Sequence, residues 1–226
     1  MTRSLKFVVG ILVLVTVFGL RTTQYANERI IPGLDQSLGQ PLRIVAFGTS
    51  LTALYTWPAT LGRRLSICLE RPVEIDVVAR PGAGSAWALD QTAHVADLLP
   101  DIVIIEFAIN DADVADGVWP RTSLVQHREI LAELQEALPE AGILLITTNP
   151  VQGLQRFKRP ILQRYYHLYS DLSEEFGSGL LHLTPNWSGR DLPDGLHPLD
   201  SDATEIIVPG IANLIAQSYG QTGACR

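Results

Sequence analysis

Residues 43–52 have the sequence Arg43-Ile44-Val45-Ala46-Phe47-Gly48-Thr49-Ser50-Leu51-Thr52. The apolar run over 44–47 predicts a buried strand, and the glycine directly after it predicts a tight turn. A serine that follows such a strand and turn occupies the place where an α/β fold exposes a nucleophile. We therefore expect Ser50 to project from the end of a central strand.

A second segment, residues 194–198, supplies the partners that a nucleophilic serine needs. A serine hydroxyl is a weak nucleophile until an imidazole takes its proton, and the imidazole needs an acid that orients it. Asp194 stands three residues before His197, so one turn can carry both side chains. Asp191 is the alternative acid, but its spacing of six residues would require the loop to fold back. Asp194 is therefore preferred.

Two further segments place unusual residues where consecutive parallel strands would end. One contains Gly84 and the other contains Asn110. In open α/β sheets the ligand crevice lies outside the carboxyl ends of the strands, so these residues are expected to converge on one pocket. A glycine backbone N–H and an asparagine side-chain N–H in that pocket would form an oxyanion hole.

These segments resemble the sequence blocks of the SGNH hydrolases, the GDSL-type esterase/lipase superfamily. The blocks appear in order over residues 42 to 215, as Gly48-Thr49-Ser50-Leu51, Gly84, Asn110-Asp111 and Asp194-x-x-His197-Pro198. The resemblance implies that Ser50 is the nucleophile, that His197 is the general base and then the acid, and that Asp194 orients His197. It also implies an oxyanion hole made of the Ser50 and Gly84 backbone N–H groups and the Asn110 amide.

The chain departs from the family pattern at two positions of these blocks. Thr49 replaces the usual aspartate, and Ala108 stands where the asparagine block commonly begins with glycine. We expect the first to change local hydrogen bonding and the second to tighten packing. The glycine block also lacks its frequent asparagine, which leaves Gly82 as a neighbouring alternative to Gly84.

The hydrophobic pattern alternates between strands and helices. Strands are predicted over 43–47, 73–79, 102–108, 143–148 and 180–183, and helices over 58–70, 86–99, 123–138, 160–176 and 203–217. This alternation predicts a three-layer αβα sandwich around a five-stranded parallel sheet. The family resemblance implies the flavodoxin-like strand order 2-1-3-4-5.

Composition and charge limit the classes of function. The chain has 226 residues, of which 46% are hydrophobic and 18% charged, as in one globular catalytic domain. Its formal net charge of −7 argues against nucleic acid as a partner, because phosphate binding needs a clustered basic face. No pair of histidines has metal-ligand spacing with a carboxylate, so we expect neither a metal nor another cofactor.

The N-terminus predicts export. Arg3 and Lys6 precede an uncharged apolar run over 7–20. Residues 1–22 are therefore predicted to be a cleaved signal peptide or an uncleaved membrane anchor, although the run is short for a spanning helix. Either alternative gives an exported protein, periplasmic or extracellular, with membrane association through 7–20 in the second case. We expect a linker over 23–41 and the hydrolase domain over 42–226.

The two cysteines do not predict a disulfide framework. Cys68 falls within a helical pattern and is expected to be a small core residue. Cys225 is next to last in the chain and is expected to be exposed.

The sequence predicts a serine esterase that works through an acyl-enzyme intermediate. Tyr55, Trp57 and Trp119 are candidates for substrate binding, where they would stack on sugars or line an acyl pocket, and the alternative is packing over the sheet. Residues 155–159 would form a flap that meets an anionic substrate or a membrane, or a solvated helix entry. We favour short acyl groups, such as O-acetyl on envelope carbohydrate. The alternatives are a lysophospholipase or thioesterase, an acyltransferase to saccharide, and a non-catalytic binding protein.

Overall fold

The computed structural model describes residues 28–34, 40–221 and 225. One parallel sheet has the strand order β2-β1-β3-β4-β5, which confirms the predicted topology. The strands are β1 (Leu42–Gly48), β2 (Val73–Ala79), β3 (Ile102–Glu106), β4 (Gly142–Thr147) and β5 (Gly179–His182). Because the pairing is parallel throughout, the carboxyl ends of all five strands lie at one edge of the sheet.

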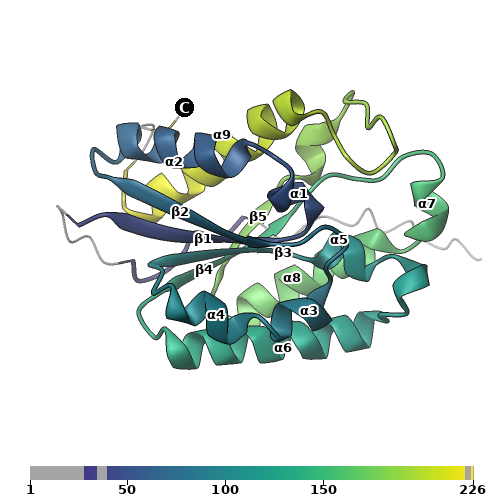
Figure 1. Ribbon diagram of the computed structural model, residues 1–226, viewed down its shortest axis with the longest axis horizontal. Coiled ribbons are helices and arrows are strands. Elements are labelled where there is room, and N and C mark those ends of the chain that lie inside the picture. Colours follow the sequence, from purple (N-terminus) through teal and green to yellow (C-terminus); the bar gives the residue numbers. More distant parts are fainter. Residues whose placement is uncertain (1–27, 35–39, 222–224, 226) are drawn as a thin grey trace, which may run out of the picture.

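Helices cover both faces of the sheet (Figure 1). One layer consists of α2 (Trp57–Cys68) and α9 (Asp200–Ser218), and the other of α3 (Ser85–Leu89), α4 (Thr92–Asp97), α6 (Pro120–Ala137) and α8 (Leu162–Phe176). Successive residues of β1 point to opposite faces, so Ile44 and Ala46 join the core under α2 and α9. Val45 and Phe47 join the core under the other layer. The apolar run over 44–47 is therefore buried on both sides.

The helical layer beside β3 differs from the sequence prediction in one place. Residues 86–99 were expected to form one helix but form α3 and α4 instead. The Thr92 hydroxyl donates to the Leu89 carbonyl at 3.0 Å, so a side chain supplies the hydrogen bond that ends α3. The expected strand over 102–108 likewise ends early, because Ala108 begins the short helix α5 (Ala108–Asp111).

Residues 28–34 pack on the domain although they fall inside the predicted linker. Ile31 and Leu34 are buried in the core under α9. Arg29 pairs with Leu180 of β5 in an antiparallel bridge, with N–H to O distances of 2.9 and 2.8 Å. A Cβ on Gly142 would collide with Ile31, so this glycine makes room for the segment.

The predicted export segment over 1–22 lies outside the described residues. None of the helices in the described part of the chain is long and apolar enough to cross a membrane.

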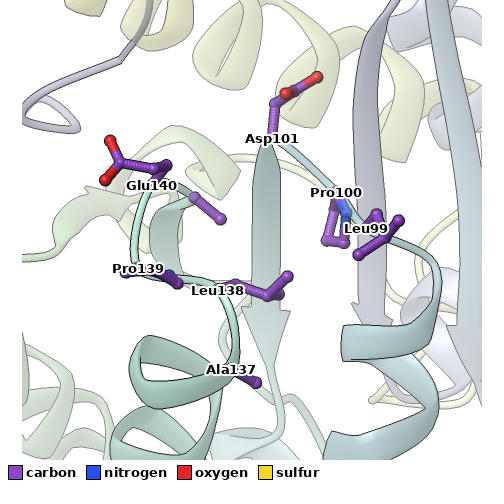
Figure 2. Close-up of a pocket in the computed structure, with 8 residues that line it drawn as sticks. Leu99, Pro100, Asp101, Ala137, Leu138, Pro139 and Glu140 are labelled. Atoms are coloured by element: carbon purple, nitrogen blue, oxygen red, sulfur yellow. The ribbon is translucent and has the colours of Figure 1, made fainter.

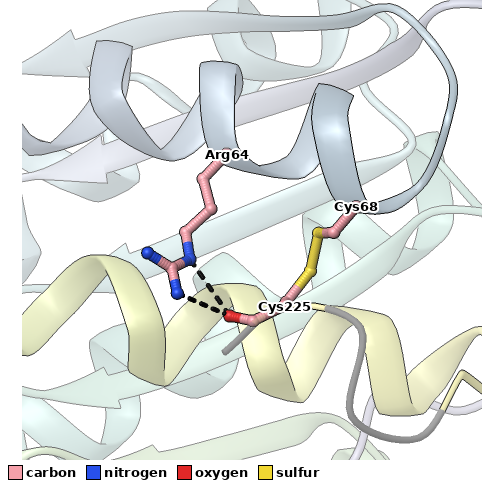
Figure 3. The surroundings of a disulfide bond; sticks show 3 residues. All are labelled: Arg64, Cys68 and Cys225. Atoms are coloured by element: carbon pink, nitrogen blue, oxygen red, sulfur yellow. Dashed lines mark hydrogen bonds between the residues drawn. A yellow bond between two sulfur atoms is a disulfide. The ribbon is translucent and has the colours of Figure 1, made fainter.

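A disulfide joins Cys68 at the end of α2 to Cys225 (Figure 3). Cys225 is buried at 2% exposure, so the prediction that it is exposed was wrong. Cys68 is half-buried against the core, as expected, but is bonded to Cys225. The Arg64 guanidinium donates two hydrogen bonds to the Cys225 carbonyl, at 3.0 and 2.9 Å, which holds the chain end against α2. The bond links residues 157 positions apart, and no local sequence pattern predicts a contact over that distance.

A pocket of about 230 Å³ lies at the amino-terminal ends of β3 and β4 (Figure 2). Leu99 and Asp101 line it on one side, and Leu138 and Glu140 line it on the other. This is the sheet edge opposite the strand ends that carry Ser50 and Asn110.

Removal of the disulfide should lower stability, because the cross-link restricts the unfolded chain over a long loop. We expect Cys68→Ala/Cys225→Ala to lose about 2–5 kcal/mol of unfolding free energy. Urea unfolding with and without dithiothreitol measures the change. The reductant should lower the midpoint of the wild type and leave that of the double variant unchanged; a wild-type midpoint insensitive to reduction would contradict the cross-link.

Candidate active site

Ser50, His197 and Asp194 form one hydrogen-bonded chain at the carboxyl edge of the sheet. Ser50 is the first residue of the short helix α1 (Ser50–Ala53), which directly follows the end of β1. Its Oγ lies 2.8 Å from His197 Nε2. His197 Nδ1 lies 2.7 Å from Asp194 Oδ2. The arrangement lets the imidazole exchange a proton with the Ser50 hydroxyl while the carboxylate orients the ring.

The environment of Asp194 keeps this carboxyl ionised. Its partial burial acts to raise the pKa, but hydrogen bonds from the His197 N–H, the His197 ring and the Leu196 N–H outweigh burial and lower the pKa to about 2. The two backbone bonds measure 2.6 and 2.9 Å. An ionised Asp194 assigns the ring proton to Nδ1, which leaves Nε2 free to accept from Ser50.

A buried carboxyl group lies beneath the serine turn. Glu106, the last residue of β3, accepts hydrogen bonds from the Thr49 N–H at 2.6 Å, the Thr49 hydroxyl at 3.0 Å and the Thr52 hydroxyl at 2.7 Å. A Cβ on Gly48 would collide with this carboxyl group, so glycine is required there. Burial raises the pKa of Glu106 to about 7, although its threonine hydrogen bonds oppose the rise.

Thr49 therefore has a defined local role at the position where the family commonly has aspartate. Besides donating to Glu106, its hydroxyl accepts the Leu51 N–H at 3.1 Å and caps α1. An acidic residue here would place a second carboxyl group against Glu106. Sequence reasoning missed Glu106, although its position opposite Gly48 in the parallel register of β1 and β3 is the pattern that would have indicated it.

The two predicted donors outside the serine turn are held next to each other. Asn110 of α5 donates one amide hydrogen to the Ala83 carbonyl at 2.8 Å, which leaves its second N–H available. Gly84 follows Ala83 and caps the start of α3. Among the described residues, neither the Ser50 nor the Gly84 backbone N–H donates to another protein group. Backbone and amide donors of this kind can stabilise a developing oxyanion.

Asp111 joins these two segments. Its Oδ1 accepts the Ser85 N–H at 2.8 Å, and its Oδ2 accepts the hydroxyls of Ser85 at 2.6 Å and Ser123 at 2.5 Å. A Cβ on Gly84 would lie 2.5 Å from Asp111 Oδ1, so the close approach depends on glycine. The alternative residue, Gly82, has open space around its Cα and φ of +74°.

Tyr169 of α8 also holds the α5 turn in place. The Tyr169 hydroxyl accepts the backbone N–H groups of Phe107 at 2.8 Å and Ala108 at 3.2 Å. It lies 3.1 Å from His127 Nε2, while His127 Nδ1 lies 2.8 Å from the Ser123 carbonyl. Burial lowers the pKa of His127 despite the nearby Asp111, so the ring is neutral and accepts from Tyr169. His127 lies on α6 and supports the turn through Tyr169.

The three aromatic candidates occupy different environments. The Tyr55 hydroxyl donates to the Pro198 carbonyl at 2.8 Å, which places this half-buried ring beside the histidine turn. Trp57 is only 1% exposed and donates from its indole to the Leu51 carbonyl at 2.7 Å, so it is a core residue and does not face substrate. Trp119 is 73% exposed and lines an apolar pocket of about 330 Å³ with Val114 and Ile161.

Comparison with known proteins places the chain in a family. The sequence matches the GDSL-like lipase/acylhydrolase family over residues 46–201, and the chain belongs to this family. No curated protein sequence matches the chain at a significant level.

Solved structures share the fold at low sequence identity. An acetyl xylan esterase from Geobacillus stearothermophilus has a TM-score of 0.66 at 18% identity, covering 77% of this chain and 94% of that one. The M. smegmatis aryl esterase has a TM-score of 0.64 at 16% identity, covering 79% and 99%. The lipase/acylhydrolase from Enterococcus faecalis has a TM-score of 0.63 at 21% identity, covering 76% and 95%. At these identities the similarity establishes the fold alone.

Replacement of Asp111 should make the positions of Gly84 and Asn110 relative to each other less well fixed. We expect Asp111→Asn to lower kcat for an aryl acetate by about 10–100-fold with little change in KM, because small misplacements of catalytic donors are costly. Steady-state kinetics with a matched thermal unfolding curve measure this. Ser123→Ala, which removes one bond to Asp111 without touching Ser85, should have a smaller effect. An equal rise in KM for both variants would argue against a role in donor placement.

The raised pKa of Glu106 predicts a particular dependence of stability on pH. Between its ordinary pKa of 4.5 and its folded pKa of about 7, the unfolded chain ionises while the folded chain keeps the proton, so stability falls as pH rises. Glu106→Gln imitates the protonated group and removes this dependence. From pH 5 to pH 8 the wild type should lose on the order of 2–3 kcal/mol more than the variant in urea unfolding. An equal fall in unfolding free energy with pH in the wild type and in Glu106→Gln would show that Glu106 does not have a raised pKa.

Proposed function

We propose that this protein is a serine esterase that hydrolyses carboxylic esters through an acyl-enzyme intermediate. The observation that carries the proposal is the hydrogen-bonded chain from Ser50 through His197 to Asp194. Membership of the GDSL-like lipase/acylhydrolase family supports the reaction class. The unpaired N–H groups of Ser50 and Gly84, together with the second amide hydrogen of Asn110, supply the oxyanion donors.

The proposed mechanism assigns each proton to a named atom. Ser50 Oγ attacks the ester carbonyl while His197 Nε2 takes the hydroxyl proton. The resulting oxyanion accepts hydrogen bonds from the N–H donors, and the ionised Asp194 stabilises the imidazolium. His197 then gives its proton to the leaving alcohol as the acyl-enzyme forms. A water molecule, deprotonated by His197 Nε2, then attacks the acyl carbonyl. The bond between the acyl carbon and Ser50 Oγ breaks, the carboxylic acid leaves, and His197 returns the proton to Ser50 Oγ.

For the substrate we propose short acyl groups on carbohydrate, such as O-acetyl esters of the cell envelope. One structural neighbour is described as an acetyl xylan esterase, which acts on an acetylated glycan. Tyr55 beside the histidine turn and the exposed Trp119 offer aromatic surfaces that suit sugar rings. No cofactor takes part in the proposed reaction.

A longer acyl substrate is the second candidate, as in a lysophospholipase or thioesterase. The apolar pocket of about 330 Å³ favours it, because its walls are apolar side chains such as Val114 and Ile161. Gly117 and Val118 of the same pocket belong to the connection between α5, which carries Asn110, and α6. The pocket therefore opens on a loop that begins at the candidate site.

For location we propose an exported protein, periplasmic or extracellular. The Cys68–Cys225 disulfide supports this, since disulfides persist in oxidising compartments. The apolar run over 7–20 supports export and, if it is retained, membrane association.

The proposal is tested by hydrolysis of aryl esters from acetyl to palmitoyl with the full chain. Ser50→Ala should lose at least about 10³-fold in kcat, because no other group replaces the nucleophile. Ser201→Ala, at an exposed serine of α9, is the control and should retain full activity. Activity that survives in Ser50→Ala would disprove the mechanism.

The acyl-length series separates the two substrates. A steep preference for acetyl supports the carbohydrate ester, whereas a rate that rises with chain length supports the longer acyl group. Hydrolysis of acetylated xylan beside the aryl acetates then tests the glycan directly.

A further inference from the structure

Five large apolar side chains stand exposed around the short helix α7 (Gln155–Lys158) and the loop that follows α5. The apolar patch consists of Val114 at 61% exposure, Trp119 at 73%, Leu154 at 80%, Phe157 at 79% and Ile161 at 40%. A monomeric protein rarely leaves so many large apolar side chains together in water. In Figure 1, α7 projects from the end of the molecule at which α5 lies.

Direct contacts join the segment around α7 to the loop that follows α5. Arg159, which follows α7, is buried and donates to the Ile109 carbonyl of α5 at 2.8 Å. It also forms an ion pair of 3.0 Å with Asp113, the residue before Val114. Ile161 and Trp119 line the same apolar pocket. Val114, Trp119 and Ile161 therefore line one pocket, and Arg159 fixes the end of α7 to the turn that carries Asn110.

Four cations stand within three residues of patch members in the sequence, while one exposed carboxylate, Asp116, lies in the same loop as Val114. Arg156 and Lys158 lie on α7, Arg121 lies in the first turn of α6 next to Trp119, and Arg164 lies in the first turn of α8. All four are exposed, and none forms an ion pair with another described residue. The chain as a whole carries a formal net charge of −7, so this rim is positive against an acidic background.

We propose that the apolar patch and its cationic rim dock the protein on the surface of an anionic lipid bilayer. Tryptophan, phenylalanine and leucine enter the boundary between headgroups and acyl chains, while lysine and arginine bind anionic headgroups. A second copy of this chain fits the surface poorly, because a symmetric contact would bring the same cations against each other. A zwitterionic surface would leave the cations without a charge complement.

Docking at this place has a consequence for the site. Val114 and Trp119 lie on the loop that follows Asn110, and Arg159 ties the end of α7 to α5. Docking would therefore hold the edge of the sheet that carries Ser50 near the lipid surface. The inference goes beyond the proposed esterase activity and does not depend on it. Hydrolysis of a soluble ester and binding to vesicles are separate measurements, so either can fail alone.

The test uses amide hydrogen exchange of the full chain, because the run over 7–20 makes total vesicle binding uninformative about this surface. Exchange is compared on vesicles of phosphatidylcholine and on vesicles that also contain phosphatidylglycerol. Segments 112–121 and 151–161 should exchange at least about fivefold more slowly on the anionic vesicles, and the effect should weaken in 0.5 M salt. The helix α2 should show no change.

A matched pair of variants separates docking from general surface effects. Leu154→Ser/Phe157→Ser should abolish the protection on anionic vesicles and leave hydrolysis of a soluble aryl acetate unchanged. Ile67→Ser is the control, since Ile67 on α2 is also 79% exposed but lies outside the patch, and it should keep the protection.

Three results would overturn the proposal. The first is equal protection on zwitterionic vesicles, and the second is equal loss of protection in Ile67→Ser. The third is protection without vesicles that grows with protein concentration, which would assign the patch to contact between copies of the chain.

Discussion

The geometry of the candidate site depends on a buried carboxyl group between the two central strands. Gly48 ends β1 and pairs in register with Glu106 at the end of β3. The carboxyl group of Glu106 accepts hydrogen bonds from Thr49 and Thr52, on either side of Ser50, so the serine turn is attached to the neighbouring strand and not only to its own. Both strands are buried on both faces, so the serine turn is fixed to a rigid part of the core. The position of Ser50 is therefore set by the sheet.

Three acidic side chains near the site have different tasks, and their surroundings explain the division. Asp194 is half exposed and receives hydrogen bonds from one turn of backbone, which keeps it charged beside His197. Glu106 is buried and forms no ion pair with another described residue, and burial raises its pKa to about 7. Asp111 accepts hydrogen bonds from two segments distant in sequence and joins them. Environment, more than residue type, decides what each carboxyl group does.

Much of the fold and the three residues of the hydrogen-bonded chain could be predicted from local sequence, whereas the residues that hold this chain in place could not. The apolar run over 44–47 and the three-residue spacing of Asp194 and His197 are short-range patterns, and the shorter spacing favoured Asp194 over Asp191. Glu106, Asp111 and the burial of Trp57 become visible only when strands and helices far apart in sequence meet. The same holds for Ile31 and Leu34, which fall in the predicted linker and pack beside Gly142, more than a hundred positions away. The replacement of aspartate by Thr49 predicted a change in local hydrogen bonding. Its partner, Glu106 on the neighbouring strand β3, could not be identified from the sequence.

The disulfide between Cys68 and Cys225 also closes a covalent ring in the chain. Ser50 precedes Cys68, whereas His197 lies inside the closed ring that the bond creates. A single cut by a protease anywhere between these cysteines would open the ring without releasing either part. The fragment that carries the serine and the fragment that carries the histidine would stay joined through sulfur. Under oxidising conditions, the protein can thus be nicked in its outer loops and still keep both halves of its site in one molecule.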